Sequence, residues 1–385
     1  MIKVVILGAG FGGITVASEL EGLAKAGKAE VALVDKGTHF SMGFSMQWAL
    51  AGRRKPDEGQ RPYAKLKAGH VKFVNDEITA IDTVNRFVQT KKYKFTYDYL
   101  VIALGAELAP ELLPGFNEVA RNLCDMQSVL QLKGEVESMK RGTIAIAVSS
   151  TPFKCPPMPY EYAFLIDDML RKRGVREGVR VVLTTPEQQP MPVAGKAVGN
   201  LVKTMLEEKG IEYLPLHKPR AIDVQNRKVI YENGFELAFD ILGAVPPHRA
   251  PKVVREAGLA DAAGFVPADI YSLKTSLADV YALGDVAALR LPNGNPHPKA
   301  GVLAEAQASA VAKSMIAAIE GGNPMAYGGT GVCYIDVGDE KAAQAEINLL
   351  APEGPRFALS QPSREGLEAK RRFEREHLDK WFGTH

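Results

Sequence analysis

The sequence predicts an α/β protein with two Rossmann-like dinucleotide-binding domains, the second inserted in the first, and a small C-terminal α+β cap. Three observations lead to this prediction. Strands alternate with helical segments along most of the chain. A glycine-rich turn joins the first strand to the first helix, and a second strand–helix unit begins near residue 143.

The first unit starts at the N-terminus with an apolar strand at residues 3–7 and a helix at 11–20. A second strand at 30–34 ends at Asp35, which completes a β-α-β arrangement. Further strands of this unit are predicted at residues 71–74, in a hairpin at 87–95, and at 99–104.

The second unit contains a strand at residues 143–148, a proline-rich loop, a helix at about 159–173 and a strand at 179–184. The chain then returns to the first domain through a strand at 280–283 and a helix at 300–319, which is stopped by two glycines. Two strands and a charged helix follow, at 332–337, 342–350 and 364–381. We therefore assign residues 1–112 and 246–325 to the first domain, 113–245 to the second, and 326–385 to the cap.

Composition excludes several classes of protein. The 385 residues include 47 Lys and Arg against 45 Asp and Glu, and a net charge of +2 argues against nucleic acid as the main partner. Three cysteines are too few for a disulfide-stapled scaffold, and no metal site is predicted. The N-terminus shows no secretory signal, and no uncharged stretch has the ~18 residues of a membrane-spanning helix. We expect a protein that is cytoplasmic or peripheral to the cytoplasmic membrane.

The glycine-rich turn has the spacing Gly8-x-Gly10-x-x-Gly13, directly after a strand and directly before a helix. Such glycines allow a tight turn and let a pyrophosphate approach the backbone at the helix N-terminus. Asp35, followed by Lys36, ends the second strand, where its carboxylate can accept hydrogen bonds from an adenosine ribose. This fingerprint alone does not separate NAD from FAD.

Two later segments resemble motifs of the flavoproteins that have two dinucleotide-binding domains. Residues 97–106, with Ala103 and Gly105, resemble their strand-and-glycine crossover. Residues 280–287, with Gly284 and Asp285, resemble their second FAD motif, whose aspartate binds the ribityl chain. The resemblance implies that FAD is the cofactor.

The helix predicted to start near Ala300 is also expected to face the cofactor. Its positive end should point at the pyrimidine edge of the flavin, where it would stabilise negative charge on the reduced ring. Lys299 and Gly301 stand at this helix start, and we expect Lys299 to neutralise the reduced flavin.

The usual glycine fingerprint for NAD(P)H is missing from the second domain. No glycine occurs between Gly142 and Gly174, and the loop after the strand is rich in proline, which has no backbone N–H and blocks close approach of a pyrophosphate. This loop contains Cys155, and Glu161 falls in the first turn of the next helix. Taken singly, Cys155 is explained at least as well as a buried hydrophobe, and Glu161 as a favourable partner of the helix dipole, as either is by a chemical role.

At Cys155-Pro-Pro-Met-Pro-Tyr-Glu161 the chain resembles the family of sulfide:quinone oxidoreductases and flavocytochrome c sulfide dehydrogenases. The likeness extends over the FAD motifs, residues 298–301 and a distant cysteine, Cys333. It implies that Cys155 and Cys333 form a redox-active bridge beside the flavin and react with sulfide. It also implies that Glu161 acts as an acid/base beside them, from an apolar pocket, and that Cys124 is the third family cysteine.

The resemblance leaves the electron acceptor open between a quinone and cytochrome c. Residues 38–43 contain no cysteine, so the covalent FAD linkage of the flavocytochromes is absent there, whereas a linkage through Cys124 stays open, as does the oligomeric state. Tyr334, Phe373 and Trp381 are expected on the acceptor side. The last helix is expected to serve as a weak membrane-surface anchor or as a docking helix for a second subunit.

Two other readings remain. An NADH:quinone oxidoreductase of the same superfamily would be reduced by NADH, although the absent second glycine loop argues against it. A flavin-binding scaffold or sensor would hold FAD without turning over a sulfur donor.

Overall fold

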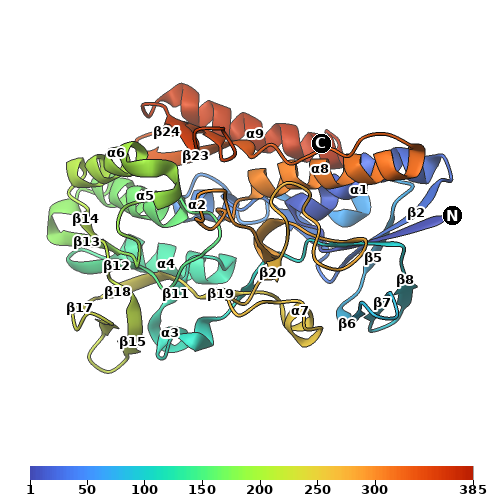
Figure 1. Ribbon diagram of the computed structural model, residues 1–385. Helices are drawn as coiled ribbons and strands as arrows, with labels where there is room; N and C mark the ends of the chain where they lie inside the picture. Colours follow the sequence, from blue (N-terminus) through green and yellow to red (C-terminus); the bar gives the residue numbers. More distant parts are fainter. Residues whose placement is uncertain (385) are drawn as a thin grey trace.

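The computed structural model describes residues 1–384 and contains two parallel five-stranded sheets beneath an antiparallel C-terminal sheet (Figure 1). The first sheet has the order β21-β9-β1-β2-β5, in which neighbouring strands are parallel. Its strands are β1 (Ile2–Leu7), β2 (Ala29–Asp35), β5 (Lys72–Asn75), β9 (Tyr99–Ile102) and β21 (Val280–Ala282). Helices α1 (Phe11–Lys25) and α8 (Gly301–Glu320) lie side by side on one face of this sheet.

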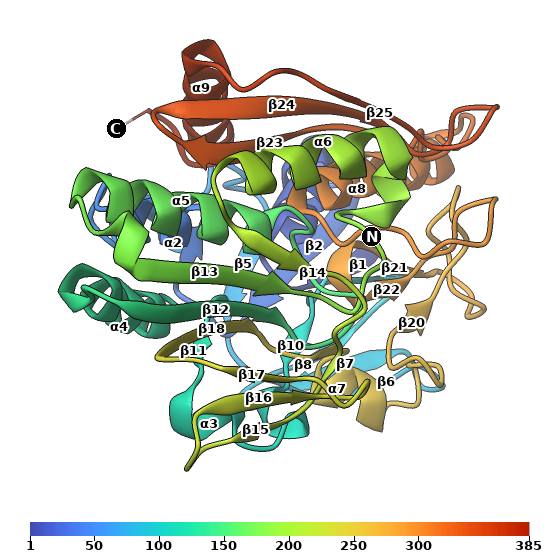
Figure 2. The same cartoon turned by 90° about the vertical axis from the view of Figure 1, so that its left-hand side faces the viewer.

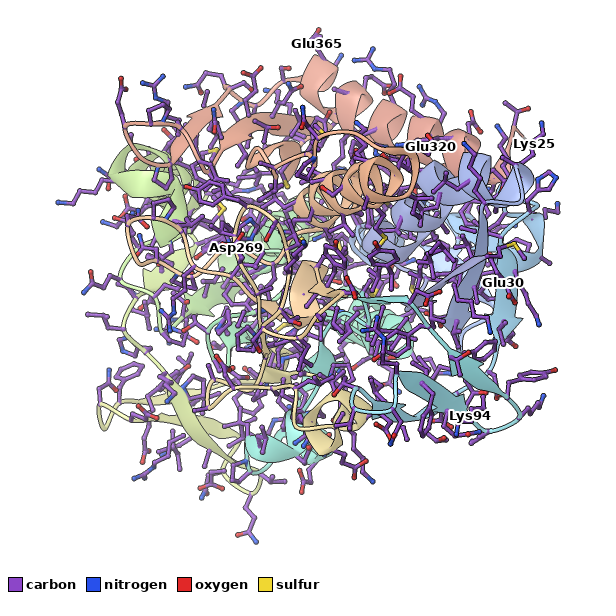
Figure 3. All side chains as sticks on the ribbon, turned by 45° about the vertical axis from the view of Figure 1, so that its right-hand side comes forward. Lys25, Glu30, Lys94, Asp269, Glu320 and Glu365 are labelled. Atoms are coloured by element: carbon purple, nitrogen blue, oxygen red, sulfur yellow. The ribbon has the colours of Figure 1, made fainter. Side chains whose placement is uncertain are left out.

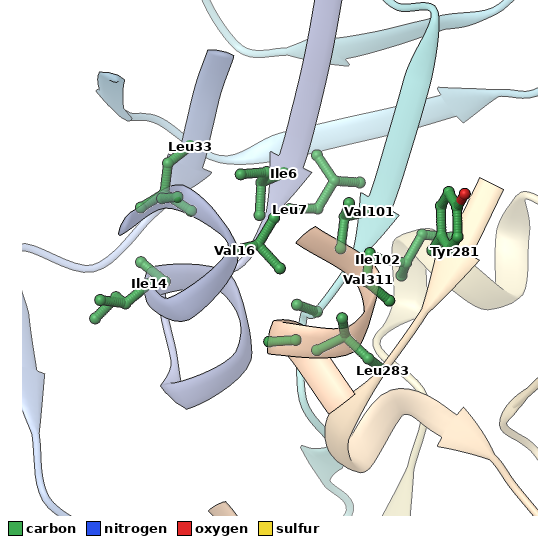
Figure 4. Packing of buried hydrophobic residues seen from close by; sticks show 14 of the residues in the cluster. Ile6, Leu7, Ile14, Val16, Leu33, Val101, Ile102, Tyr281, Leu283 and Val311 are labelled. Carbon is green, nitrogen blue, oxygen red and sulfur yellow. The ribbon is translucent and has the colours of Figure 1, made fainter. Parts of the chain in front are cut away.

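Apolar side chains fill the space between this sheet and its two helices (Figure 4). Ile6 and Ile102 from the strands meet Ile14 and Val16 from α1 and Val311 from α8, and all five are fully buried. Burying each such side chain contributes about 1.5–3 kcal/mol, so this interface holds the glycine turn between β1 and α1 in place.

The second sheet has the order β11-β18-β12-β13-β14 and is also parallel throughout. Its strands are β11 (Arg121–Asn122), β12 (Gly142–Val148), β13 (Val179–Thr184), β14 (Glu212–Leu214) and β18 (Ile241–Val245). Its helices are α4 (Met126–Ser138), α5 (Met158–Lys172) and α6 (Gly195–Glu208). Every residue of α5 from Met158 to Leu170 is buried, because the helix lies between this sheet and the cap (Figure 2).

The cap is an antiparallel sheet of β23 (Thr330–Gly338), β24 (Lys341–Asn348) and β25 (Arg356–Leu359), followed by α9 (Arg364–Phe382). Ser363 caps α9 by accepting a hydrogen bond from the backbone N–H of Gly366 at 3.0 Å. In both views the cap lies across the helices of the two parallel-sheet domains (Figures 1 and 2).

Smaller elements complete the chain. Among them are a ribbon of β10 (Glu107–Leu108) with β19 (His248–Arg249), and helices α2 (Ser45–Leu50), α3 (Phe116–Val119) and α7 (Lys252–Glu256). The small sheets contain β3 (His39–Ser41), β4 (Gln60–Pro62), β6 (Ile78–Asp82), β7 (Phe87–Thr90), β8 (Lys94–Thr96), β15 (Pro219–Asp223), β16 (Lys228–Tyr231), β17 (Glu236–Ala238), β20 (Val266–Pro267) and β22 (Ala287–Ala288).

The predicted fold class is confirmed, because the second parallel sheet is formed by residues that lie between β9 and β21 of the first. The first helix continues to Lys25 rather than ending at Leu20, since Leu23 extends its buried stripe. Sequence patterns predicted the hairpin of β7 and β8 but left α2, α4, α6 and the other strands of the small antiparallel sheets unassigned. α2 and the small strands are short, so their hydrophobic periodicity is weak. α4 and α6 are amphipathic helices of 13 and 14 residues whose periodicity the sequence analysis did not use.

The apolar side of α9 faces the protein's own interior, so it gives no support to the expected anchor or docking helix. Leu367, Leu378, Trp381 and Phe382 are buried within the chain. Its outward residues are charged, such as Glu365, which Figure 3 shows at the surface. By length and hydropathy α8 could cross a membrane, but half of it is buried inside the protein, as in a core helix.

Candidate functional site

The glycine turn after β1 forms an open cradle at the N-terminus of α1. A Cβ on Gly13 would lie 1.7 Å from the carbonyl oxygen of Gly8, and a Cβ on Gly8, whose φ is +96°, would lie 2.5 Å from that of Ala103. Gly10 is different, since no heavy atom lies within 4 Å of a Cβ placed there. Gly8 and Gly13 therefore make the turn possible, and Gly10 leaves its outer side free for a ligand.

Asp35 lies beside this cradle. Its carboxylate accepts hydrogen bonds from the backbone N–H groups of Ala9 and Gly37, both at 2.7 Å. The carboxylate is thereby held at the carboxyl edge of the sheet, where a ribose would meet it. Lys36 is exposed and points away from the core.

Replacing Gly13 with alanine is expected to weaken FAD binding at least ~10-fold, because the Cβ overlaps the Gly8 carbonyl and deforms the cradle. The ratio of flavin to protein absorbance after purification and a titration of the apoprotein with FAD measure this change. Gly22→Ala is the matched control, since its site in the same helix is open. It should keep FAD affinity and add about 0.5–1 kcal/mol of stability. Equal FAD affinity in both variants would contradict the assigned cradle.

The second predicted cofactor segment lies at the start of α8. The Lys299 Nζ donates hydrogen bonds to the carbonyl oxygens of Asp285 at 2.6 Å and Ala287 at 3.1 Å. Burial lowers the pKa of Lys299 to about 8, although Asp285 opposes this shift. Burial also raises the pKa of the Asp285 carboxyl, against the influence of Lys299 and Lys154. The cation is thus held on the main chain of the aspartate motif.

The remaining predicted cofactor residues are placed by backbone geometry. Gly105 and Gly284 have φ values of +68° and +71°, and the Gly284 N–H donates to Gln307 at 2.7 Å. Gly301 begins α8, where a Cβ would approach the ring of Phe11 to 2.9 Å. The open cradle, the held carboxylate of Asp35 and the half-buried Asp285 have the chemistry that a dinucleotide requires, so these residues fit FAD.

The loop that carries Cys155 is tied to this cofactor segment. The Cys155 N–H donates to the carbonyl oxygen of Lys299 at 2.7 Å, and the Cys155 carbonyl accepts from Met158 N–H at 2.8 Å at the start of α5. These bonds hold Cys155 at a φ of +55°, a left-handed conformation that non-glycine residues rarely adopt. The main chain of Cys155 is therefore fixed beside that of Lys299.

The backbone strain predicts opposite responses to glycine at the two cysteines. Cys155→Gly should be about 1 kcal/mol more stable than Cys155→Ala, because glycine adopts the left-handed conformation without steric cost. Cys333 lies in β23, so there the glycine variant should be less stable than the alanine variant by about 0.5–1 kcal/mol. Urea unfolding of the four variants measures both differences, and a destabilising effect of glycine at both positions would exclude strain at Cys155.

The structure brings Cys333 into electrostatic range of Cys155 and Glu161, and all three cysteines are free thiols. Burial raises the pKa of the Cys333 thiol to about 11 and that of Cys155 well above its usual range. In both cases Glu161 adds to this effect and Lys370 opposes it. Cys124 also acts electrostatically on the Cys155 thiol. Its Sγ lies 3.9 Å from the Sδ of Met158, and burial raises its pKa to about 11.

Glu161 is buried as expected, but its surroundings are polar rather than apolar. One carboxylate oxygen accepts from the backbone N–H of Asp336 at 2.8 Å and from the Lys370 Nζ at 2.5 Å. The other oxygen accepts from the Gln47 side chain at 2.8 Å. Glu161 and Lys370 are each only 2% exposed, so they form a buried ion pair between α5 and α9.

Sequence reasoning missed Lys370 as a site residue. Burial alone would lower the pKa of Lys370, but Glu161 and Asp336 outweigh it and raise the pKa, so the side chain is a cation. A sequence signal was present, because Lys370 and Glu374 fall on the helical stripe of Leu367, Leu378 and Trp381. Charged residues on an apolar helical stripe indicate buried partners, although they do not identify those partners.

Two of the aromatic residues predicted on the acceptor side, Tyr334 and Phe373, lie on the face of β23 away from Cys333. Side chains alternate along a strand, so Tyr334 points away from Cys333. The Tyr334 ring meets Phe373 of α9 at a centroid distance of 5.9 Å, and Trp381 meets Phe11, beside the glycine turn, at 5.4 Å. β23 thus separates the thiols from this aromatic cluster.

Comparisons with known proteins agree with this geometry. The sequence profile of the pyridine nucleotide-disulphide oxidoreductase family matches residues 2–310. A mitochondrial sulfide:quinone oxidoreductase of Dictyostelium discoideum is 30% identical over 306 residues, which cover 74% of this chain and 66% of that protein, just under two thirds. A type II NADH:quinone oxidoreductase of Staphylococcus haemolyticus is 25% identical over 329 residues, 81% of each protein. The X-ray structure of the sulfide:quinone oxidoreductase from Aquifex aeolicus superposes with a TM-score of 0.86 at 24% identity, covering 100% of this chain and 96% of that one.

Proposed function

This chain belongs to the pyridine nucleotide-disulphide oxidoreductase family, and from that premise we propose that it is an FAD-dependent enzyme that oxidises sulfide and delivers the electrons to a quinone. The resemblance predicted from the motifs is confirmed, since the relatives include sulfide:quinone oxidoreductases. One observation carries the proposal. The backbone of Cys155 is bonded to Lys299 at the predicted flavin edge, in the position where a pyridine nucleotide loop would otherwise stand.

The chain's own residues account for the sulfur chemistry. Hydrosulfide attacks the Cys333 sulfur of a Cys155–Cys333 bridge, which forms a persulfide on Cys333 and releases Cys155 as a thiolate. The Lys370 cation favours thiolates at both cysteines, and burial opposes them. The thiolate state is therefore expected to be short-lived, which favours rapid re-formation of the bridge.

A second hydrosulfide takes the outer sulfur of the persulfide as hydrogen disulfide, which leaves Cys333 as a thiolate. Re-forming the disulfide from the Cys155 and Cys333 thiolates then releases two electrons. FAD, when bound, supplies the carrier for these electrons. Glu161 lies in range of both thiols, and its bonds to Lys370, Gln47 and the Asp336 N–H hold its carboxylate in one position, from which it can take and return the protons of the sulfur groups.

A direct test compares two electron donors. The purified protein is loaded with FAD and mixed without oxygen with sulfide or with NADH while the flavin band near 450 nm is followed. Sulfide should bleach the band during the mixing experiment, whereas NADH should leave its absorbance unchanged. Bleaching by NADH alone would select the NADH:quinone oxidoreductase alternative, and bleaching by neither would leave a flavin-binding scaffold.

The acceptor is assigned to a quinone because the Dictyostelium and Staphylococcus relatives both carry quinone in their names. The aromatic cluster of Tyr334 and Phe373 gives a planar apolar acceptor a surface to stack on, on the face of β23 away from the thiols. Steady-state turnover with a soluble quinone should exceed turnover with cytochrome c. The opposite order would favour the flavocytochrome-type reaction.

A further inference from the structure

A cavity of about 390 Å³ opens beside Cys333, between the second parallel sheet and the cap. Its cap wall is the inner face of β23, β24 and β25, which carries Cys333, Ile335, Ala345, Ile347, Phe357 and Leu359. Cys155 does not line it, although its neighbours Pro156 and Pro157 do. A small molecule in this cavity would therefore meet the sulfur of Cys333.

The opposite wall follows the carboxyl ends of β12 and β13, where a parallel α/β sheet normally binds its ligand. Pro152 and Phe153 follow β12, and Glu187 follows β13. Met191 to Ala194, with Val198 of α6, complete this side. The place of a dinucleotide is thus occupied by an apolar chamber of the size that small-molecule sites have.

The charged side chains of this wall are already hydrogen-bonded to neighbouring groups of the protein. Among the described residues that line the cavity, the titratable groups besides Cys333 are Glu187, His297 and Lys299. The Lys299 Nζ is bonded to two carbonyl oxygens, and the His297 ring nitrogens are bonded to the Pro298 carbonyl and the Tyr327 hydroxyl. Burial lowers the pKa of His297 to about 4, so its ring is neutral.

Glu187 is the carboxyl group of this wall, and it can take up a proton near neutral pH. Burial raises its pKa to about 7, and its carboxylate accepts a hydrogen bond from the Tyr160 hydroxyl at 3.1 Å. A ligand with several fixed charges would lose its hydration, while the Lys299 cation in the wall is already bonded to two carbonyl oxygens, so its entry costs several kcal/mol. An uncharged apolar body has no charge to dehydrate, and burying its apolar surface favours its entry.

We propose that this cavity binds the acceptor that removes sulfur from Cys333, and that the acceptor is a thiol with an uncharged apolar body. The inference rests on the proposed function, which places a persulfide on Cys333. Glu187 takes the proton of the bound thiol. The resulting thiolate attacks the outer sulfur of the Cys333 persulfide, so that a new S–S bond forms, the Cys333 S–S bond breaks and its electron pair stays on Cys333 as a thiolate. The product is an organic persulfide, and no further oxidant is needed for this step.

The test compares acceptors during sulfide oxidation with a soluble quinone. The FAD-loaded enzyme receives 2-phenylethanethiol, glutathione or sulfite at equal concentrations, and the product persulfide is alkylated and identified by mass spectrometry. We expect kcat/KM for 2-phenylethanethiol to exceed that for glutathione and for sulfite at least 10-fold. Equal or better use of glutathione or sulfite would overturn the proposal.

Failure of the underlying function is recognised separately, because flavin bleaching by sulfide alone requires no acceptor. If sulfide bleaches the flavin but 2-phenylethanethiol is not converted, only the acceptor inference fails.

A matched pair of variants tests the location. Ala194→Trp fills the cavity wall, whereas Ala358→Trp adds the same side chain on the exposed outer face of β25. The first should lower kcat/KM for 2-phenylethanethiol at least 10-fold and the second should leave it unchanged. Equal effects of the two variants would place acceptor binding elsewhere.

A competition experiment tests the same cavity in the unmodified enzyme. 2-Phenylethyl methyl sulfide, which cannot react, should compete with the thiol, and lack of competition would likewise count against the cavity.

Discussion

Cys333→Ser is expected to lower the rate of flavin reduction by sulfide by ~10³-fold or more, with FAD still bound. The serine oxygen cannot form the sulfur bridge that hydrosulfide attacks, nor hold a persulfide. Cys155→Ser should have an effect of the same size, since each cysteine is one half of the bridge. The double variant should be no slower than either single one, because the two residues act as a unit.

Stopped-flow absorbance near 450 nm after anaerobic mixing with sulfide measures these rates. Thr330→Ser, at the exposed start of the same strand as Cys333, is the control and should keep the rate of the unmodified enzyme. The spectrum of bound flavin before mixing shows that each variant has kept its cofactor. Unchanged bleaching in both cysteine variants would remove the thiols from the mechanism.

Lys370→Met is expected to lower the free energy of unfolding by about 3–5 kcal/mol, because it leaves the Glu161 carboxylate buried without its cation. This is a large share of the ~5–15 kcal/mol that stabilises a typical domain. Adding Glu161→Gln in the same chain should restore a large part of the loss, since the second change removes the unpaired charge. Urea unfolding of the FAD-loaded proteins measures the three values.

Lys203→Met provides the comparison for a surface pair. Lys203 and Glu207 are 3.2 Å apart on α6 and about half exposed, so the loss there should stay within about 0.5 kcal/mol. If Lys370→Met costs no more than Lys203→Met, the Glu161–Lys370 pair is not an essential contact between α5 and α9.

The sequence by itself determined the fold class and the cofactor cradle, because both depend on patterns that are local along the chain. Gly8, Gly13 and Asp35 stand at fixed offsets from β1 and β2, and backbone sterics alone require those glycines. The missing second glycine loop could be read in the same way, from the prolines around Cys155.

The family resemblance already paired Cys155 with Cys333, but only the tertiary structure decided which charged groups meet. Lys370 lies 209 positions from Glu161 along the chain, and the periodicity of α9 indicates that Lys370 is buried without identifying its partner. The cavity beside Cys333 likewise arises where the cap sheet covers the ends of β12 and β13. Electrostatic pairing and cavity shape depend on distances between separate elements, and hydrophobic periodicity within one element contains no information on those distances.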